Sequence, residues 1–83
     1  MGSVICTFKV FVSDMDNFDS VKKKLLELKP ERLEEEALAF GLKAIKIVKF
    51  IPDAPGVMEE LEDELNGIEG VSEVETVSIS RGL

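Results

Sequence analysis

The chain has 83 residues, of which 45% are hydrophobic, and its 17 acidic and 10 basic side chains give a net charge of −7. A chain of this length can form one two-layer core but no deep enzymatic cleft, so residues 1–83 are predicted to be a single domain. The acidic balance disfavours direct binding of nucleic acid, whose phosphates would be repelled, and favours a basic protein partner.

The residue types that most often carry catalysis and metal binding are scarce. Histidine is absent and Cys6 is the only cysteine. A lone cysteine cannot form an internal disulfide, which favours a reducing, cytoplasmic location. No apolar run approaches the roughly 20 residues of a membrane span, and Met1-Gly2-Ser3 lacks the basic start of a signal peptide. We therefore expect no cofactor, no metal, no membrane and no small-molecule substrate of the chain's own.

The first predicted element is a strand over residues 4–12. One of its faces is wholly apolar and carries Val4, Cys6, Phe8, Val10 and Val12. The other face is mixed, and near-continuous apolarity of this kind is typical of a central strand with one covered face. The polar residues 13–17 then form a connection.

A helix is predicted next, from about Asp19 to Leu28. The candidate N-caps are short polar side chains, those of Asp16, Asn17 and Asp19. The apolar stripe falls at positions i, i+4 and i+7, which are Val21, Leu25 and Leu28. The lysines at 22–24 are expected to face water. Pro30 ends the helix, because the residue before a proline is steered out of the α region.

Residues 31–38 carry conflicting signals. Their glutamates, leucines and alanine are good helix formers. However, Pro30 precedes them, a strand follows Gly41, and a small sheet needs a polar edge strand at this place in the order. Charges on an edge strand also discourage edge-to-edge aggregation. We predict a strand.

An aromatic residue followed by glycine, Phe40-Gly41, stands at the entrance to the next strand. Glycine permits a turn with positive φ that other residues resist, and such a turn can direct Phe40 outward. A lone phenylalanine is more often part of the core. The alternative is an exposed aromatic anchor for a partner, the residue class that dominates binding hot spots. The residues alone leave both interpretations open.

The strand that follows is predicted over residues 42–51, because it is rich in β-branched and aromatic side chains, and Pro52 ends its ladder. Lys43 and Lys49 share a face with the isoleucines of this strand. The pattern therefore does not show which face meets the helices.

A proline-containing turn leads to a second predicted helix, Val57 to Asn66. Its apolar stripe is Val57, Leu61 and Leu65, and acidic side chains cover the outside. The acidic residues lack the spacing of a calcium loop, so a solvated face is favoured over a cation site. Gly67 is predicted to take the left-handed position past the helix end. Residues 71–80 form a last, half-polar strand, expected at an edge.

The predicted order is β-α-β-β-α-β, and the first and third strands are the most apolar. Right-handed crossovers place these two strands in the middle of a four-stranded antiparallel sheet with both helices on one face. This arrangement is the ferredoxin-like sandwich, an α+β fold. It hosts many functions, so it does not by itself identify one.

Three stretches, residues 37–47, 51–53 and 61–71, together resemble archaeal translation elongation factor 1-beta. The eukaryotic counterpart is the C-terminal exchange domain of the elongation factor 1 complex. The resemblance is close from about Glu34 to Val77 and looser over the first strand and helix. The aromatic-Gly-Leu-Lys-Ala-Ile motif that starts at Phe40 and the Gly-Ile-Glu-Gly-Val motif that starts at Gly67 are specific in combination.

The resemblance implies a ferredoxin-like guanine nucleotide exchange factor without bond chemistry, acting on the GTPase elongation factor 1-alpha. In the family, the aromatic of the Phe-Gly turn packs on the GTPase, which here assigns partner binding to Phe40, Gly41, Leu42 and Lys43. A basic residue at the extreme C-terminus of the family disturbs the magnesium and phosphate region. The eukaryotic members carry it next to last, where this chain has Gly82, so the resemblance assigns that role to Arg81. With a partner implied, the anchor interpretation of Phe40 is favoured.

The main alternative is an ACT-like small-molecule-binding regulatory domain, which shares the fold. An acylphosphatase-type enzyme would need an arginine in the connection after the first strand, and residues 13–17 contain none. An RNA-recognition module is disfavoured by the missing glycine-aromatic signature and by the net charge. A metal carrier would need a Cys-x-x-Cys motif.

Overall fold

The computed structural model describes residues 2–81, so Met1, Gly82 and Leu83 lie outside the described part of the chain. The strands are β1 (Ser3–Val12), β2 (Arg32–Ala37), β3 (Lys43–Pro52) and β4 (Val71–Arg81). The helices are α1 (Phe18–Glu27) and α2 (Val57–Asn66), with 3₁₀ turns η1 (Met15–Asn17) and η2 (Ala39–Gly41).

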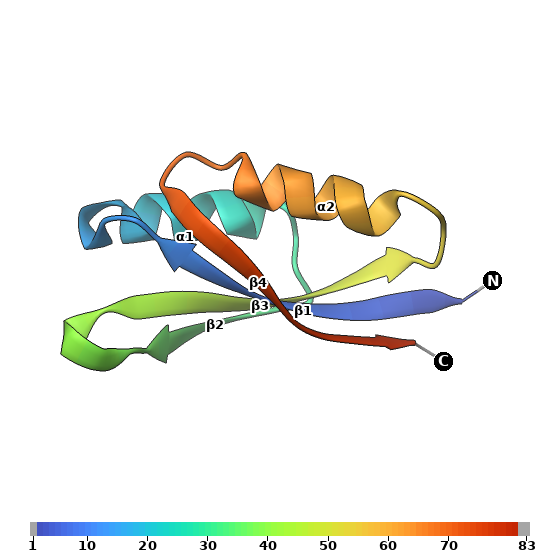
Figure 1. Cartoon of the computed structure of the whole chain (residues 1–83), viewed down its shortest axis with the longest axis horizontal. Helices are drawn as coiled ribbons and strands as arrows, with labels where there is room; N and C mark the ends of the chain where they lie inside the picture. The colour runs from blue at the N-terminus through green and yellow to red at the C-terminus, as the bar shows by residue number, and fades with distance from the viewer. Residues whose placement is uncertain (1, 82–83) are drawn as a thin grey trace.

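The strands form a single antiparallel sheet in the order β2-β3-β1-β4. Both helices lie on one face of this sheet, and the other face is open (Figure 1). The ferredoxin-like fold predicted from the sequence is confirmed, with the two most apolar strands at the centre and the polar β2 and β4 at the edges. No helix in the described part of the chain is long and apolar enough to cross a membrane.

The core lies between the sheet and the helices. Its fully buried side chains come from the predicted apolar face of β1, from β3 and from the helix stripes: Cys6, Phe8, Val10, Val21, Leu25, Ile45, Ile47 and Leu65. Full burial of a side chain of this size contributes about 1.5–3 kcal/mol. The alternating pattern of β1 and the helical periodicity of α1 and α2 therefore account for most of the core.

Lys49 lies on the covered face of β3, together with the buried isoleucines. Its Nζ donates hydrogen bonds to the carbonyl oxygens of Leu28, at 2.8 Å, and Lys29, at 3.3 Å, just beyond the end of α1. The last carbonyls of a helix have no partner within the helix and carry partial negative charge, so an ammonium group satisfies them. A charged residue can thus share a face with the core because it caps a helix.

The predicted caps of α1 were wrong in one respect. Asn17 does occupy the N-cap position, but its side chain makes no capping hydrogen bond. The capping side chain belongs to Asp14, whose Oδ1 accepts a hydrogen bond from the backbone nitrogen of Asp16 at 2.9 Å and so begins η1. The polar connection folds as a separate 3₁₀ turn ahead of the helix.

The prediction of a left-handed Gly67 was also wrong. Gly67 has φ −80° and ψ −8°, which is helical backbone. The left-handed residue of this turn is Gly70, with φ +99°. A Cβ atom on Gly70 would lie 2.8 Å from Cγ2 of Val21, so the α2–β4 turn can approach α1 only with glycine here.

Candidate functional site

The Phe40-Gly41 turn joins edge strand β2 to central strand β3 at one end of the sheet (Figure 1). Phe40 has φ +61° and Gly41 has φ +75°, so two consecutive residues are left-handed. Backbone hydrogen bonds close the turn, from Leu38 N to Leu42 O at 2.8 Å and from Leu42 N to Ala39 O at 3.2 Å. Glycine adopts this conformation freely, whereas a non-glycine residue held in it costs about 1–3 kcal/mol.

The side chain of Phe40 points away from the fold and is 98% exposed. The core interpretation of this residue was therefore wrong, and the predicted outward turn is confirmed. Leu42, on the far side of the glycine, is also an exposed large apolar residue. The turn thus holds a strained backbone conformation while its aromatic side chain contributes nothing to the core. Strained backbone of this kind is found at functional sites.

Lys43, at the start of β3, belongs to an ionic cluster behind this turn. Its Nζ lies 3.6 Å from Oε1 of Glu35, whose Oε2 lies 2.7 Å from Nζ of Lys22. The hydrogen bond from Lys22, followed by the charges of Lys22 and Lys43, holds the pKa of the Glu35 carboxyl below its ordinary 4.5. Nζ of Lys43 also lies 5.7 Å from the ring centroid of Phe18. Lys43 therefore contacts both β2 and α1 behind the turn.

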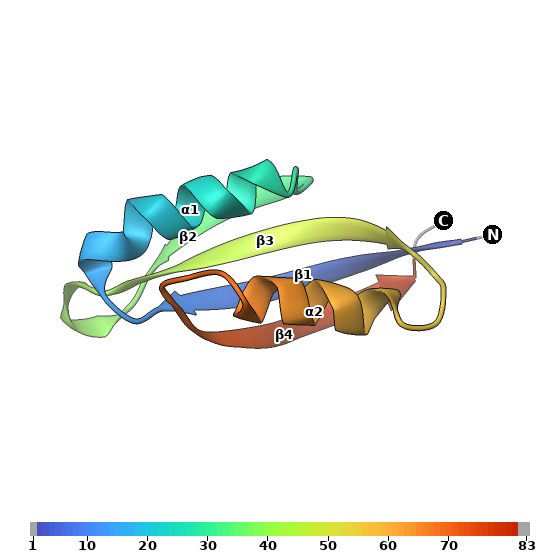
Figure 2. The same ribbon diagram turned by 90° about the horizontal axis from the view of Figure 1, so that it is seen from above.

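Arg81 ends β4 at the opposite end of the sheet, beside the start of β1 (Figure 2). The length of β3, ten residues, separates the two ends and corresponds to about 33 Å at ~3.3 Å per residue. Arg81 reaches across the end of β1 and forms an ion pair with Asp53, which directly follows β3. The Arg81 side chain is nonetheless 80% exposed.

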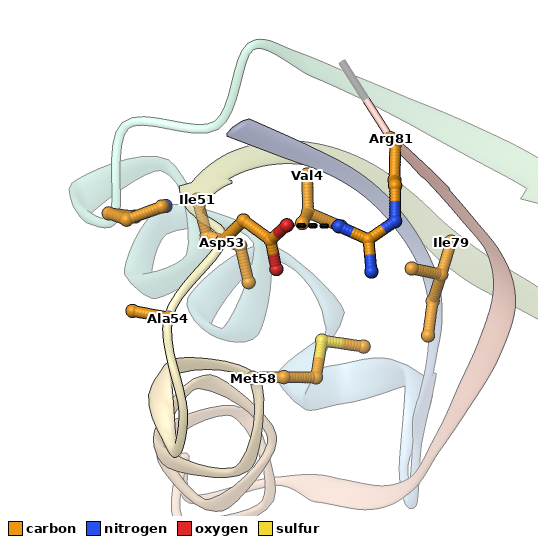
Figure 3. Close-up of a pocket in the computed structure, with 8 residues that line it drawn as sticks. Val4, Ile51, Asp53, Ala54, Met58, Ile79 and Arg81 are labelled. Carbon is orange, nitrogen blue, oxygen red and sulfur yellow. Dashed lines mark hydrogen bonds and ion pairs between the residues drawn. The ribbon is translucent and has the colours of Figure 1, made fainter. Parts of the chain in front are cut away.

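A cavity of about 330 Å³ lies beside this ion pair (Figure 3). Apart from Asp53 and Arg81, its lining is apolar and consists of Val4, Ile51, Pro52, Ala54, Met58 and Ile79. The volume is at the lower end of the range for small-molecule sites. The only charged residues of the described chain that line the cavity, Asp53 and Arg81, are paired with each other.

Cys6 is buried under α2, where its Sγ donates to Sδ of Met58 at 3.4 Å. Burial, and secondarily the charge of Glu62, raises the pKa of this thiol above its ordinary 9.0. A protonated, buried thiol is neither a nucleophile nor a metal ligand near neutral pH. Among residues 2–81, no group of three or more Cys, Asp or Glu side chains is arranged to hold a metal ion.

The predicted site residues therefore form two surfaces. Phe40, Gly41, Leu42 and Lys43 are contiguous at the β2–β3 end, whereas Arg81 lies at the other end of the sheet. Asp53, the partner of Arg81, was not predicted as a site residue. The signal that could have found it is the Ile-Pro-Asp stretch at 51–53, which the family resemblance already includes.

Comparison with known proteins defines the class to which this fold and these surfaces belong. Residues 7–81 match the family model described as the EF-1 guanine nucleotide exchange domain, and the chain belongs to that family. The match begins within β1 and covers both helices and the other three strands in full.

Particular relatives from archaea are named elongation factor 1-beta. The chain is 38% identical to the protein of Methanothermobacter thermautotrophicus, with 98% of each chain covered. It is 34% identical to that of Methanoregula boonei, over 96% of this chain and 98% of the relative. It is 36% identical to that of Archaeoglobus fulgidus, over 90% and 92%. The family resemblance predicted from the sequence is confirmed over nearly the whole chain.

Proposed function

We propose that this chain is a cytoplasmic exchange factor that promotes GDP release and GTP reloading on elongation factor 1-alpha during translation elongation. The observation that carries the proposal is Phe40, 98% exposed on a strained turn of an EF-1 guanine nucleotide exchange domain. An aromatic held outward in this way is suited to fill a pocket on a partner protein.

The mechanism requires no bond to be made or broken. A factor that binds the nucleotide-free GTPase more tightly than the GDP-bound form must, by linkage, weaken GDP binding by the same factor. A thousandfold weakening of GDP would require about 4 kcal/mol of differential binding energy. Buried apolar contact by Phe40 can supply part of this energy if its pocket is open only in the nucleotide-free form.

Arg81 is the proposed second contact. Its guanidinium carries several N–H donors in a planar fork that fits phosphate and carboxylate oxygens. At the GTPase it would compete with the bound magnesium ion for this oxygen-rich environment and so loosen the nucleotide. Because Arg81 and Phe40 lie at opposite ends of the sheet, the factor would span two separate regions of the GTPase.

The acidic surface of the chain supports a basic partner. A net charge of −7 accelerates encounter with a positively charged protein surface and repels nucleic acid. We therefore expect the association rate with elongation factor 1-alpha to fall as salt is added, because exposed charges are screened within about 8–10 Å at ordinary ionic strength.

The test is release of labelled GDP from the cognate elongation factor 1-alpha with and without the chain. Acceleration at micromolar factor is expected, and its absence would refute the proposal. Arg81→Ala should lower the maximal exchange rate more than it lowers affinity. Arg32→Ala is the matched control, since it removes an exposed arginine from the edge strand β2.

The ACT-like alternative is tested in the same preparation. Amino acids would be titrated calorimetrically against the chain, because the cavity beside Arg81 is the place where such a ligand would fit. Binding there, together with no effect on GDP release, would favour a small-molecule regulatory domain over an exchange factor.

A further inference from the structure

The position of the Arg81 side chain is set by a residue on another strand. Arg81 pairs with Val4 of β1, and β1 lies between β4 and β3, so the guanidinium has to cross β1 to reach Asp53. Two strand spacings of ~4.8 Å separate β4 from β3, a span of about 10 Å that an extended arginine can bridge. The ion pair therefore fixes an extended conformation of a side chain that would otherwise sample many rotamers.

Asp53 itself is anchored by the backbone. Its N–H donates to the carbonyl oxygen of Gly2 at 3.2 Å, and Pro52 before it still pairs with Ser3 in the sheet. The next backbone nitrogen, of Ala54, donates to the carbonyl oxygen of Pro52 at 2.9 Å. The backbone of Asp53 is thus held at the sheet end independently of Arg81, and it places the carboxylate within reach of the guanidinium.

The pairing leaves much of the guanidinium accessible. Asp53 is engaged through one terminal nitrogen, Nη1. Figure 3 shows the second terminal nitrogen without a drawn partner, pointing toward the space between Met58 and Ile79. Together with the 80% exposure of the side chain, this geometry allows an anion to bind the remaining donors while the Asp53 contact persists.

We propose that Asp53 is a positioning residue for Arg81: it holds the guanidinium extended at the sheet end, with its remaining donors accessible, before the GTPase arrives. This inference rests on the proposed function and adds a residue to it. Asp53 does not touch the nucleotide region itself. It removes the entropy cost of ordering a long side chain at the moment when Arg81 meets phosphate or carboxylate oxygens, which is the usual benefit of preorganisation.

The expected effect follows from the cost of immobilising one rotamer-rich side chain, which corresponds to roughly a two- to tenfold change in rate. Asp53→Asn, which preserves side-chain size and the backbone contacts, should lower the maximal GDP release rate by this factor. The concentration of factor at half-maximal rate should change little, because the Phe40 surface is untouched. Asp53→Glu keeps the charge and should recover part of the rate.

Controls separate positioning from charge and from folding. Glu59→Gln removes one exposed carboxylate from the first turn of α2 and should leave exchange unchanged. In an Arg81→Ala background, Asp53→Asn should have no further effect on the rate, because its target is gone. In the free protein, the order parameter of the Arg81 Nε–H group should fall in Asp53→Asn, whether or not a GTPase is present.

The outcomes discriminate between the two proposals. If the unaltered chain accelerates GDP release and Asp53→Asn accelerates it equally well, only the positioning role is overturned. If Asp53→Asn is faster than the unaltered chain, the ion pair restrains Arg81 and the positioning role is again wrong. If the unaltered chain does not accelerate release, the proposed function fails, and the positioning role fails with it.

Discussion

Replacing Phe40 by alanine should separate partner binding from folding. The side chain is 98% exposed, so its removal exposes no core and takes almost no apolar area from the folded state. We expect the free energy of unfolding to change by no more than about 0.5 kcal/mol, as for surface substitutions in general. Phe8→Ala, at a fully buried position of β1, should instead cost about 3–5 kcal/mol.

The effect on exchange is expected to be large. Burying a phenylalanine side chain in a partner's pocket is worth about 1.5–3 kcal/mol. The half-saturating concentration of factor in the GDP release assay should therefore rise roughly ten- to hundredfold in Phe40→Ala. Phe50→Ala is the matched control, because Phe50 is a 49% exposed aromatic on the open face of β3. It should leave the half-saturating concentration within about twofold, a shift of ~0.4 kcal/mol.

Phe40→Gly is a sharper test, because the left-handed backbone at position 40 is strained with phenylalanine but is adopted freely by glycine. This variant should be at least as stable to urea as the unaltered chain and yet exchange as poorly as Phe40→Ala. The reasoning fails if either variant loses more than about 2 kcal/mol of stability, an amount that denotes core packing. It also fails if both exchange normally.

Three further predictions concern stability and are measured by urea unfolding. Gly70→Ala should destabilise the chain by at least about 1 kcal/mol, because a new Cβ would clash with Val21 in a left-handed backbone; an unchanged midpoint would contradict this packing. Lys49→Ala should cost about 1 kcal/mol by leaving the carbonyls of Leu28 and Lys29, just beyond α1, without this partner, and hydrogen exchange should increase in the last turn of that helix first. Glu35 has a lowered pKa, so its pairing stabilises the fold fully above pH 4.5, and this contribution disappears as the pH falls through the lowered value. In both Glu35→Gln and Lys22→Met, the free energy of unfolding should no longer show this decrease at acid pH.

The sequence predicts the fold well because the core follows simple periodicities. Alternation identified the buried face of β1, and the 3.6-residue period identified Leu61 and Leu65 in α2. These signals are local, since each residue's side is set by its own strand or helix. The edge strand β2 was the harder case, and the sheet's need for an edge correctly outweighed helix propensity.

The local errors arose where distant segments decide the backbone. Four short polar side chains lie between positions 14 and 19, and propensity cannot rank them as caps. The choice is made by the α2–β4 turn, because Ser13 N donates to the carbonyl oxygen of Gly70 at 2.9 Å and so fixes where β1 ends. The same turn explains Gly67, since the position that must be left-handed is the one pressed against Val21. Neither contact is visible in a local window.

The candidate site likewise has one feature that local sequence determines and one that depends on contacts between distant segments. The outward direction of Phe40 could be predicted from Phe40-Gly41, because the turn is made by those two residues themselves. The contact between Asp53 and Arg81 could not, because it joins residues 28 positions apart across an intervening strand. Such a pair becomes visible only when the order β3-β1-β4 is known.

Strand β3 connects the two surfaces, since it begins two residues after Gly41 and ends one residue before Asp53. It pairs with β1 from Ala44 to Pro52 and with β2 from Lys43 to Val48, so for about half its length it is bonded on both sides. We expect a strand supported in this way to flex little, so that the spacing between the Phe40 and Arg81 surfaces stays nearly constant. The Phe40 and Arg81 surfaces can then contact the GTPase at the same time only if the GTPase changes its conformation to match that spacing. The proposed exchange therefore assigns the conformational change to the GTPase and the fixed geometry to this chain.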